Sequence, residues 1–234
     1  MSSEELLIGI DEAGRGPLFG DMVIALVCCS REAVDRLKSY GVVDSKELSP
    51  EQRAVLARAV IACSRLVVTT RVSPLEIDTF NLNRLTLDKI LYLLSSIRCF
   101  ISVDHVRAIY VDMVRGYERV IGGIEKLYPR ASIVFEERAD SKYTVVAAAS
   151  IIAKHYRDML IKELKRVYGE IGSGYPVDKR TIDWIIESYS RGSKPPPFLR
   201  RTWSILERIA PKWYREKRVR DTSQKSILDY IMGR

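Results

Sequence analysis

The sequence contains no long apolar stretch. Its longest run without a charged residue, 143–153, is 11 residues, well short of the ~20 that a membrane-spanning helix needs. Acidic residues stand at positions 4 and 5, where a signal peptide would have a basic segment leading into an apolar one. We therefore expect a cytoplasmic protein without membrane contact.

Cysteine is also scarce, and its placement excludes two kinds of site. The four cysteines are Cys28, Cys29, Cys63 and Cys99. They lack the paired spacing of a zinc site, and sequence neighbours form disulfides poorly. They are typical of small buried apolar residues in a reducing compartment.

The positive charge is concentrated at one end of the chain. The 234 residues carry a net charge of +8, but residues 1–190 hold 26 basic and 26 acidic groups, whereas residues 191–234 hold 12 and 4. A proline run at 195–197 separates the two parts. The sequence thus predicts a domain over 1–194 and a basic, mainly helical extension over 195–234, and we expect a monomer.

Apolar patterning indicates alternating strands and helices. Strands are expected at 6–11, 22–29, 65–72, 108–112 and 132–135. Helices are expected at 50–63, 83–98 and 181–189, with a long one from 140 to 168. The first two strands are placed to form a hairpin, and the later alternation predicts an α/β domain with a mixed sheet.

Four carboxylates stand where these elements begin or end. Asp11 and Glu12 close the first strand, Asp112 closes a later one, and Asp140 starts the long helix. A carboxylate at the end of a buried strand requires a cation, a hydrogen-bonding partner or a raised pKa. Oxygen-only ligation suits Mg²⁺ or Mn²⁺. The alternative is that each acid is a helix cap or a solvated strand end.

Adjacent residues on a strand point to opposite faces. Asp11 and Glu12 can therefore share one site only if the strand ends there. Gly14 and Gly16 follow directly and favour such an end.

Residues 9–17, GIDEAGRGP, resemble the signature of the type 2 ribonucleases H (ribonuclease HII). Later blocks at 44–49, 109–112, 139–154 and 172–176 are similar to that family in order and spacing. The resemblance covers about residues 5–203, and in length the chain resembles the archaeal members.

The resemblance implies an RNase H-like fold, a mixed five-stranded sheet flanked by helices with a C-terminal helical extension. It implies an endonuclease that hydrolyses the RNA strand of RNA–DNA hybrids, with a role in DNA replication and repair. It also implies cleavage of duplex DNA on the 5′ side of a single embedded ribonucleotide, leaving a 5′-phosphate and a 3′-hydroxyl. Two divalent cations, Mg²⁺ or Mn²⁺, would be held by the catalytic acids Asp11, Glu12, Asp112 and Asp140.

Six residues are candidates for substrate binding: Gly14, Arg15, Gly16, Tyr175, Lys46 and Lys154. By resemblance the glycine triplet reads the ribose 2′-hydroxyl, which suits backbone groups that approach a sugar without a Cβ in the way. By resemblance the tyrosine stacks on the deoxyribose that follows, and the two lysines are candidates for phosphate contacts. Taken alone, these residues would be a tight turn, a loop tyrosine and surface lysines.

Two other functions stay open at this point. Type 3 ribonuclease H has a related core but usually carries an extra N-terminal domain, for which an acid at position 11 leaves no room. A non-catalytic nucleic-acid-binding protein would have lost at least one acid, and all four are present.

The basic extension is expected to hold the duplex backbone, through contacts that weaken with salt. Its basic and aromatic residues are Arg200, Arg201, Lys212, Arg215, Lys217, Arg218, Arg220, Trp203, Trp213 and Tyr214. The alternative is a solvated basic helix.

Overall fold

The computed structural model describes residues 5–42 and 48–217. Its centre is a five-stranded sheet in the order β3-β2-β1-β4-β5. The strands are β1 Leu6–Ala13, β2 Met22–Ser30, β3 Leu66–Val72, β4 Val106–Asp112 and β5 Ser132–Glu136. β1 pairs antiparallel with β2 and parallel with β4. The predicted α/β class and the mixed five-stranded sheet are confirmed.

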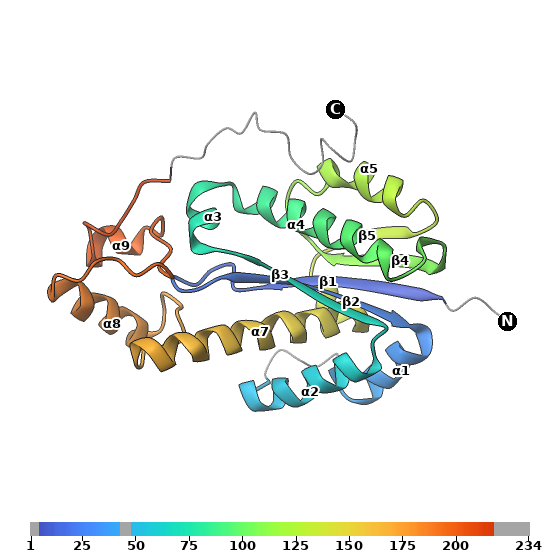
Figure 1. Ribbon diagram of the computed structural model, residues 1–234, viewed down its shortest axis with the longest axis horizontal. Helices are drawn as coiled ribbons and strands as arrows, with labels where there is room; N and C mark the ends of the chain where they lie inside the picture. The colour runs from blue at the N-terminus through green and yellow to red at the C-terminus, as the bar shows by residue number, and fades with distance from the viewer. Residues whose placement is uncertain (1–4, 43–47, 218–234) are drawn as a thin grey trace.

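Helices cover both faces of this sheet (Figure 1). One layer consists of α1 Arg31–Ser39, α2 Pro50–Cys63 and α7 Thr144–Tyr168. The other consists of α3 Pro74–Thr79, α4 Leu82–Ser96 and α5 Glu118–Leu127, with 3₁₀ turns at Ile97–Cys99 and Val103–His105. Alternate strand residues supply the two cores: Ile8 and Ile10 pack on the α4 side, and Ala13 on the α7 side.

Helix α7 lies directly against β1. A Cβ added at Gly9 would stand 2.2 Å from the carbonyl oxygen of Val145, so the first turn of α7 occupies the space that a side chain would need. Any other residue at position 9 would push the helix away from the strand.

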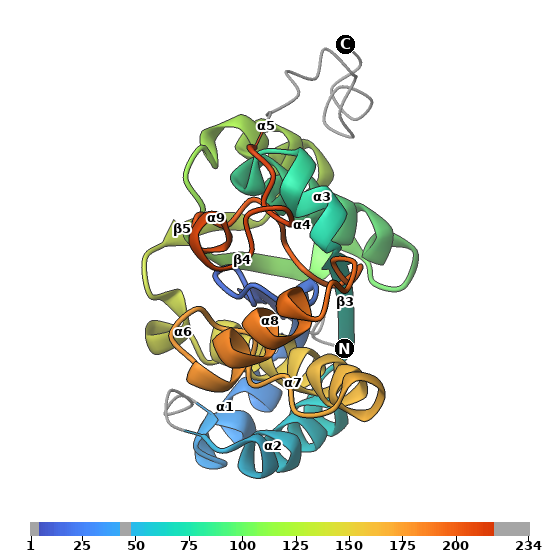
Figure 2. The same ribbon diagram turned by 90° about the vertical axis from the view of Figure 1, so that its left-hand side faces the viewer.

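A third apolar cluster closes the end of the sheet. It joins Leu18 and Phe19 to Ile161, to Ile185 of α8 (Lys179–Ser190) and to Leu206 of α9 (Ile205–Ile209). Figure 2 shows α8 and α9 together at this end. The cluster spans position 195, and the predicted division into 1–194 and 195–234 stays a prediction. Within 195–217, the described part of the extension, α9 is the only α-helix.

Two of the differences from the predicted boundaries affect the position of the acids. The long helix is interrupted at Tyr143, which separates α6 (Ala139–Lys142) from α7, so Asp140 lies on α6. Strand β1 does not end at the acids but continues to Ala13, because residues 11–13 stay paired with β2. Within the described residues no helix is long and apolar enough to cross a membrane.

Candidate active site

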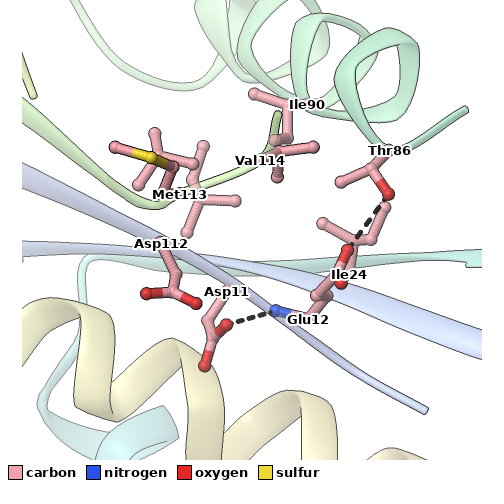
Figure 3. A pocket seen from close by; sticks show the side chains of 10 residues that line it. Asp11, Glu12, Ile24, Thr86, Ile90, Asp112, Met113 and Val114 are labelled. Carbon is pink, nitrogen blue, oxygen red and sulfur yellow. Dashed lines mark hydrogen bonds between the residues drawn. The ribbon is translucent and has the colours of Figure 1, made fainter. Parts of the chain in front are cut away.

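Asp11 and Asp112 lie next to each other on neighbouring parallel strands. The β1–β4 register pairs Ile10 with Val111, so the residues that follow these two are also adjacent. Figure 3 shows both carboxylates on one side of the strands, with Ile90 and Val114 on the other. The sheet thus places two like charges side by side.

Burial and this neighbour alter the chemistry of Asp11. The residue is only 9% exposed. Burial raises its pKa to about 7, the charge of Asp112 adds to the rise, and Ser150, the Glu12 N–H and Lys154 oppose it. The Glu12 N–H donates to Asp11 Oδ1 at 2.7 Å. The buried Ser150 hydroxyl makes no hydrogen bond to a described residue. The protein therefore offsets the negative charge of Asp11 only in part.

Asp112 also carries a raised pKa. Burial is the main cause, and the charges of Asp140 and Glu12 add to it. The backbone N–H of Ala139 donates to Asp112 Oδ1 at 3.0 Å, which ties the start of α6 to the end of β4. Asp140 follows in that helix. The charges of Asp140 and Glu12 thus act on Asp112, and the charge of Asp112 acts on Asp11.

Glu12 points to the opposite face of β1. Its carboxylate forms an ion pair with Arg15, whose Nη2 lies 3.1 Å from Oε2. The Thr86 hydroxyl of α4 lies 3.0 Å from the same oxygen (Figure 3). Asn83 accepts from Arg15 Nη1 at 2.9 Å. The expectation that the strand ends at the acids is therefore wrong, and Glu12 is held by α4 instead of facing Asp11.

The donor set suits a hard cation. Asp11 and Asp112 form no ion pair with a described lysine or arginine, and both pKa values are raised, so a nearby cation would relieve the cost of ionising them. Within the described residues, no three acidic, cysteine or histidine side chains surround one point as metal ligands. The orientation of Glu12 toward Arg15 is consistent with this. The metal-binding roles of the four acids stay predictions.

The glycine loop that follows β1 has one buried glycine and one open glycine. Gly14 has φ +91°, and a Cβ there would stand 2.7 Å from the Arg157 side chain, so the fold itself requires glycine. Gly16 is exposed, and a Cβ there would meet nothing within 4 Å. No described part of the chain requires glycine at position 16, which leaves space for a ligand.

The tyrosine loop is joined to the glycine loop. The Leu18 N–H donates to the Gly174 carbonyl at 2.6 Å. Tyr175 is 39% exposed, and the guanidinium of Arg157 lies 5.0 Å from the centre of its ring. Arg157 thus contacts both loops, which the sequence separates by about 160 positions.

Comparison with known proteins identifies the family. The family model described as Ribonuclease HII matches residues 8–206. The chain belongs to the ribonuclease HII family. A ribonuclease HII from Hyperthermus butylicus is 43% identical over 236 residues, 97% of this chain and 95% of the relative. One from Saccharolobus solfataricus is 42% identical over 90% of this chain and 96% of the relative.

Solved structures agree with this assignment. The ribonuclease H2 of Pyrococcus horikoshii OT3 has a TM-score of 0.79 at 38% identity, over 89% of this chain and 98% of that one. The structure of a PCNA:RNase HII complex from Archaeoglobus fulgidus has a TM-score of 0.74 at 33% identity, over 87% of this chain and 96% of that one. As a member of the ribonuclease HII family the chain is a nuclease, a ribonuclease H, and the non-catalytic alternative is wrong.

Of the two lysines expected to contact phosphates, the structure describes one. Lys154 is partly buried on α7, and its charge acts on Asp11. Lys46 lies outside the described residues. Their phosphate contacts stay predictions.

The expectation that the extension presents its basic and aromatic residues to a duplex is wrong for two of them. Arg200 and Trp213 are buried, at 0% and 3% exposed. The Arg201 side chain donates to the Trp213 carbonyl at 2.5 Å. These side chains build the third cluster and its edge. Arg218 and Arg220 lie outside the described residues.

Sequence reasoning missed the residues that support the site. Thr86, Asn83, Ser150 and Arg157 stand in helices that read as ordinary amphipathic elements. The sequence offered one signal for Arg157. It stands three positions after Lys154, so the two basic residues share one face of a helix whose other residues there are mostly apolar. Nothing local marks Thr86 or Asn83, because only the fold brings α4 to β1.

Proposed function

We propose that this ribonuclease H cuts the RNA strand of hybrids and also cuts duplex DNA on the 5′ side of an embedded ribonucleotide. The products would carry a 5′-phosphate and a 3′-hydroxyl. The observation that carries the proposal is the juxtaposition of two partly compensated carboxylates, the buried Asp11 and the half-buried Asp112, with a glycine loop whose outer position is open at Gly16.

Two divalent cations, Mg²⁺ or Mn²⁺, would be bound by Asp11, Glu12, Asp112 and Asp140. A related ribonuclease HIII was solved in complex with Mn²⁺. When bound, such ions activate water and offset the charge that develops on the phosphate. Since both aspartates have raised pKa values because of burial, a cation would keep them ionised at neutral pH.

The protein's own groups would orient these acids and the substrate. The Ala139 N–H fixes one oxygen of Asp112, and Arg15 with Thr86 holds Glu12. The loop around Gly16 would read the 2′-hydroxyl through backbone groups, which serve as donor or acceptor toward it. Tyr175, supported by Arg157, would stack on the next deoxyribose.

The test is cleavage of a duplex that contains one ribonucleotide, with Mg²⁺ or Mn²⁺. A single nick on the 5′ side of the ribonucleotide, with a 5′-phosphate on the downstream fragment, supports the proposal. Cleavage only within longer RNA runs would favour the substrate preference of type 3 ribonucleases H. Cleavage in the presence of EDTA would contradict the metal requirement.

A further inference from the structure

Arg200 is the largest fully buried side chain in the described part of the protein. It follows the proline run, in the segment that leads to α9. Its charge has no carboxylate within ion-pair distance among the described residues. Burial lowers its pKa to about 9, and the nearby positive charge of Arg157 contributes. A charge buried without a counter-charge is costly, so its partners are informative.

The guanidinium donates to backbone carbonyl groups on both sides of the glycine loop. Arg200 Nη2 lies 2.7 Å from the Gly14 carbonyl oxygen and Nη1 lies 3.0 Å from that of Arg15. Nε and Nη2 lie 2.9 and 2.8 Å from that of Gly20. The guanidinium makes these four bonds from three nitrogens in one plane, whereas a lysine ammonium carries its three donors on a single nitrogen.

Trp203, three residues after Arg200, contacts the next carbonyl of the glycine loop. Its indole Nε1–H donates to the Gly16 carbonyl at 2.9 Å, and the Arg200 guanidinium lies 5.4 Å from its ring centre. Asp78 of α3 holds the segment between them, because it accepts from the backbone N–H groups of Arg201 and Thr202 at 2.7 and 3.1 Å.

Three successive carbonyls of the loop are therefore fixed. Those of Gly14 and Arg15 determine where the N–H groups of the loop point, whereas the Gly16 carbonyl shares its peptide unit with Pro17, which has no N–H. In a trans peptide the N–H lies opposite the C=O. The N–H groups of Arg15 and Gly16 share peptide units with the fixed carbonyls of Gly14 and Arg15, so they face away from the guanidinium. Neither N–H donates to any residue in the described ranges, which leaves both available to an oxygen outside the protein.

We infer that Arg200 is a positioning residue for ribose recognition, which aims the N–H groups of Arg15 and Gly16 at the 2′-hydroxyl, and that Trp203 supports it by holding the Gly16 carbonyl at the outer end of the loop. This rests on the proposed function of the loop. It assigns to the C-terminal segment a part in specificity, in place of the duplex-backbone contact that its basic composition suggests. Neither side chain touches the substrate in this role.

Trp203→Phe tests the support at the outer end of the loop, because it keeps an aromatic ring and removes the indole N–H that donates to Gly16. Trp213→Phe is its matched control: it removes an indole donor in the same segment, to the Ser193 carbonyl at 3.1 Å, away from the loop. Arg200→Lys keeps the charge but has its three donors on one nitrogen, so it cannot reproduce the four bonds of the guanidinium. Each variant is assayed for kcat and KM on a single-ribonucleotide duplex, for Kd on the all-DNA duplex of the same sequence, and for thermal unfolding.

We expect Trp203→Phe to lower kcat/KM on the ribonucleotide duplex by roughly three- to tenfold, the effect of one hydrogen bond, and Arg200→Lys to lower it further. The Kd for the all-DNA duplex should stay within about twofold in both, and Trp213→Phe should change neither quantity. An unchanged kcat/KM in Trp203→Phe would overturn the inference. So would an equal loss in Trp213→Phe, or an equal weakening of all-DNA binding.

Gly16→Ala separates this inference from the proposal on which it rests. If Gly16→Ala keeps full kcat/KM, the loop does not read the ribose and both are overturned. If Gly16→Ala loses activity while Trp203→Phe and Arg200→Lys keep it, the loop reads the ribose without help from the C-terminal segment, and the inference alone fails.

Discussion

Two pairs of like charges lie at the same end of the sheet, and the protein treats them in opposite ways. Asp11 and Asp112 stand side by side and repel each other, with few groups from the protein to compensate them. Arg157 and Arg200 also repel each other, but Arg200 donates to three backbone carbonyls and Arg157 packs against Tyr175. The charges of the acidic pair are left for a group outside the protein to offset, whereas the arginine pair finds its partners within the protein.

This difference separates catalysis from specificity. In the proposed function the acids would bind a cation before a phosphate approaches, so activity would depend on what the solution supplies. The arginines fix the geometry of two loops before any ligand binds, which is the preorganisation that recognition needs. Changes to the acidic pair should therefore alter turnover, and changes around the arginine pair should alter stability or selectivity.

The largest effect is expected at Asp112. Asp112→Asn removes one charge of the acidic pair and should lower cleavage by roughly 10³-fold or more, as loss of a metal-binding carboxylate does. Duplex affinity measured by fluorescence anisotropy should stay within about threefold. The control is Asp104→Asn, an exposed aspartate paired with Arg130, which should cleave normally. Near-normal turnover in Asp112→Asn would show that this acid is not part of the catalytic site.

The cost of the acidic pair should be visible in stability. The raised pKa of Asp11, about 7, means that the folded protein holds this proton more strongly than the unfolded chain does. The free energy of unfolding of the metal-free protein should thus fall as pH rises from about 4 to 7, by up to roughly 4 kcal/mol. Asp11→Asn should remove this slope and stabilise the metal-free protein at pH 8, although it abolishes cleavage.

Urea unfolding in EDTA between pH 4 and 8 measures this slope. Mg²⁺ should then stabilise the wild type more than Asp11→Asn, because binding to the native state alone adds to its stability. A slope that is the same in both proteins would mean that Asp11 is not the group responsible.

The arginine pair predicts a smaller, purely structural effect at Gly14. In Gly14→Ala the new methyl group would overlap Arg157 at a φ of +91°, which should lower the free energy of unfolding by about 2–3 kcal/mol. For Gly16→Ala, two residues along, the free energy of unfolding should stay within about 0.5 kcal/mol of the wild-type value, because the new Cβ meets open space. Thermal unfolding of the two variants compares them directly, and equal destabilisation would contradict the assignment of the inner and outer glycine.

The smallest effect is expected from the end of the chain. A deletion from residue 205 would remove the buried Leu206, Ala210 and Trp213, so the deletion should begin after Lys217. Loss of 218–234, with four basic and two acidic residues, should weaken hybrid binding by only a few-fold and slightly reduce its salt dependence. The cleavage position should not move. An unchanged salt dependence would show that these residues make no phosphate contact.

Much of the fold could be predicted because its signals are local. A helix is expected from residue 50, and α2 begins there, with Ser49 as its N-cap and Pro50 in its first turn. The apolar runs predict all five strands. Helices α1 and α5 were not predicted, because their apolar residues are few and interrupted by charges or glycine. Strand β1 was predicted to end at the acids, but cross-strand pairing with β2 carries it to Ala13.

The candidate site could be predicted less completely. The resemblance pointed to the acids, the glycine loop and Tyr175, through the motif at 9–17 and the later blocks at 109–112, 139–154 and 172–176. It did not indicate that Glu12 is paired with Arg15 and held by Thr86, because that contact joins positions 74 apart.

The sequence by itself determined the strands of the sheet, because apolar runs mark them. It also determined the family and the four candidate acids, because contiguous motifs carry them. Only the tertiary structure decided which charges are inside. Arg200 and Arg201 are neighbours in a basic segment, yet the first is fully buried among carbonyls and the second is partly exposed. Whether a charge is solvated or buried depends on the segments that pack around it, and the loop from β1 that surrounds Arg200 lies about 180 residues away in the chain.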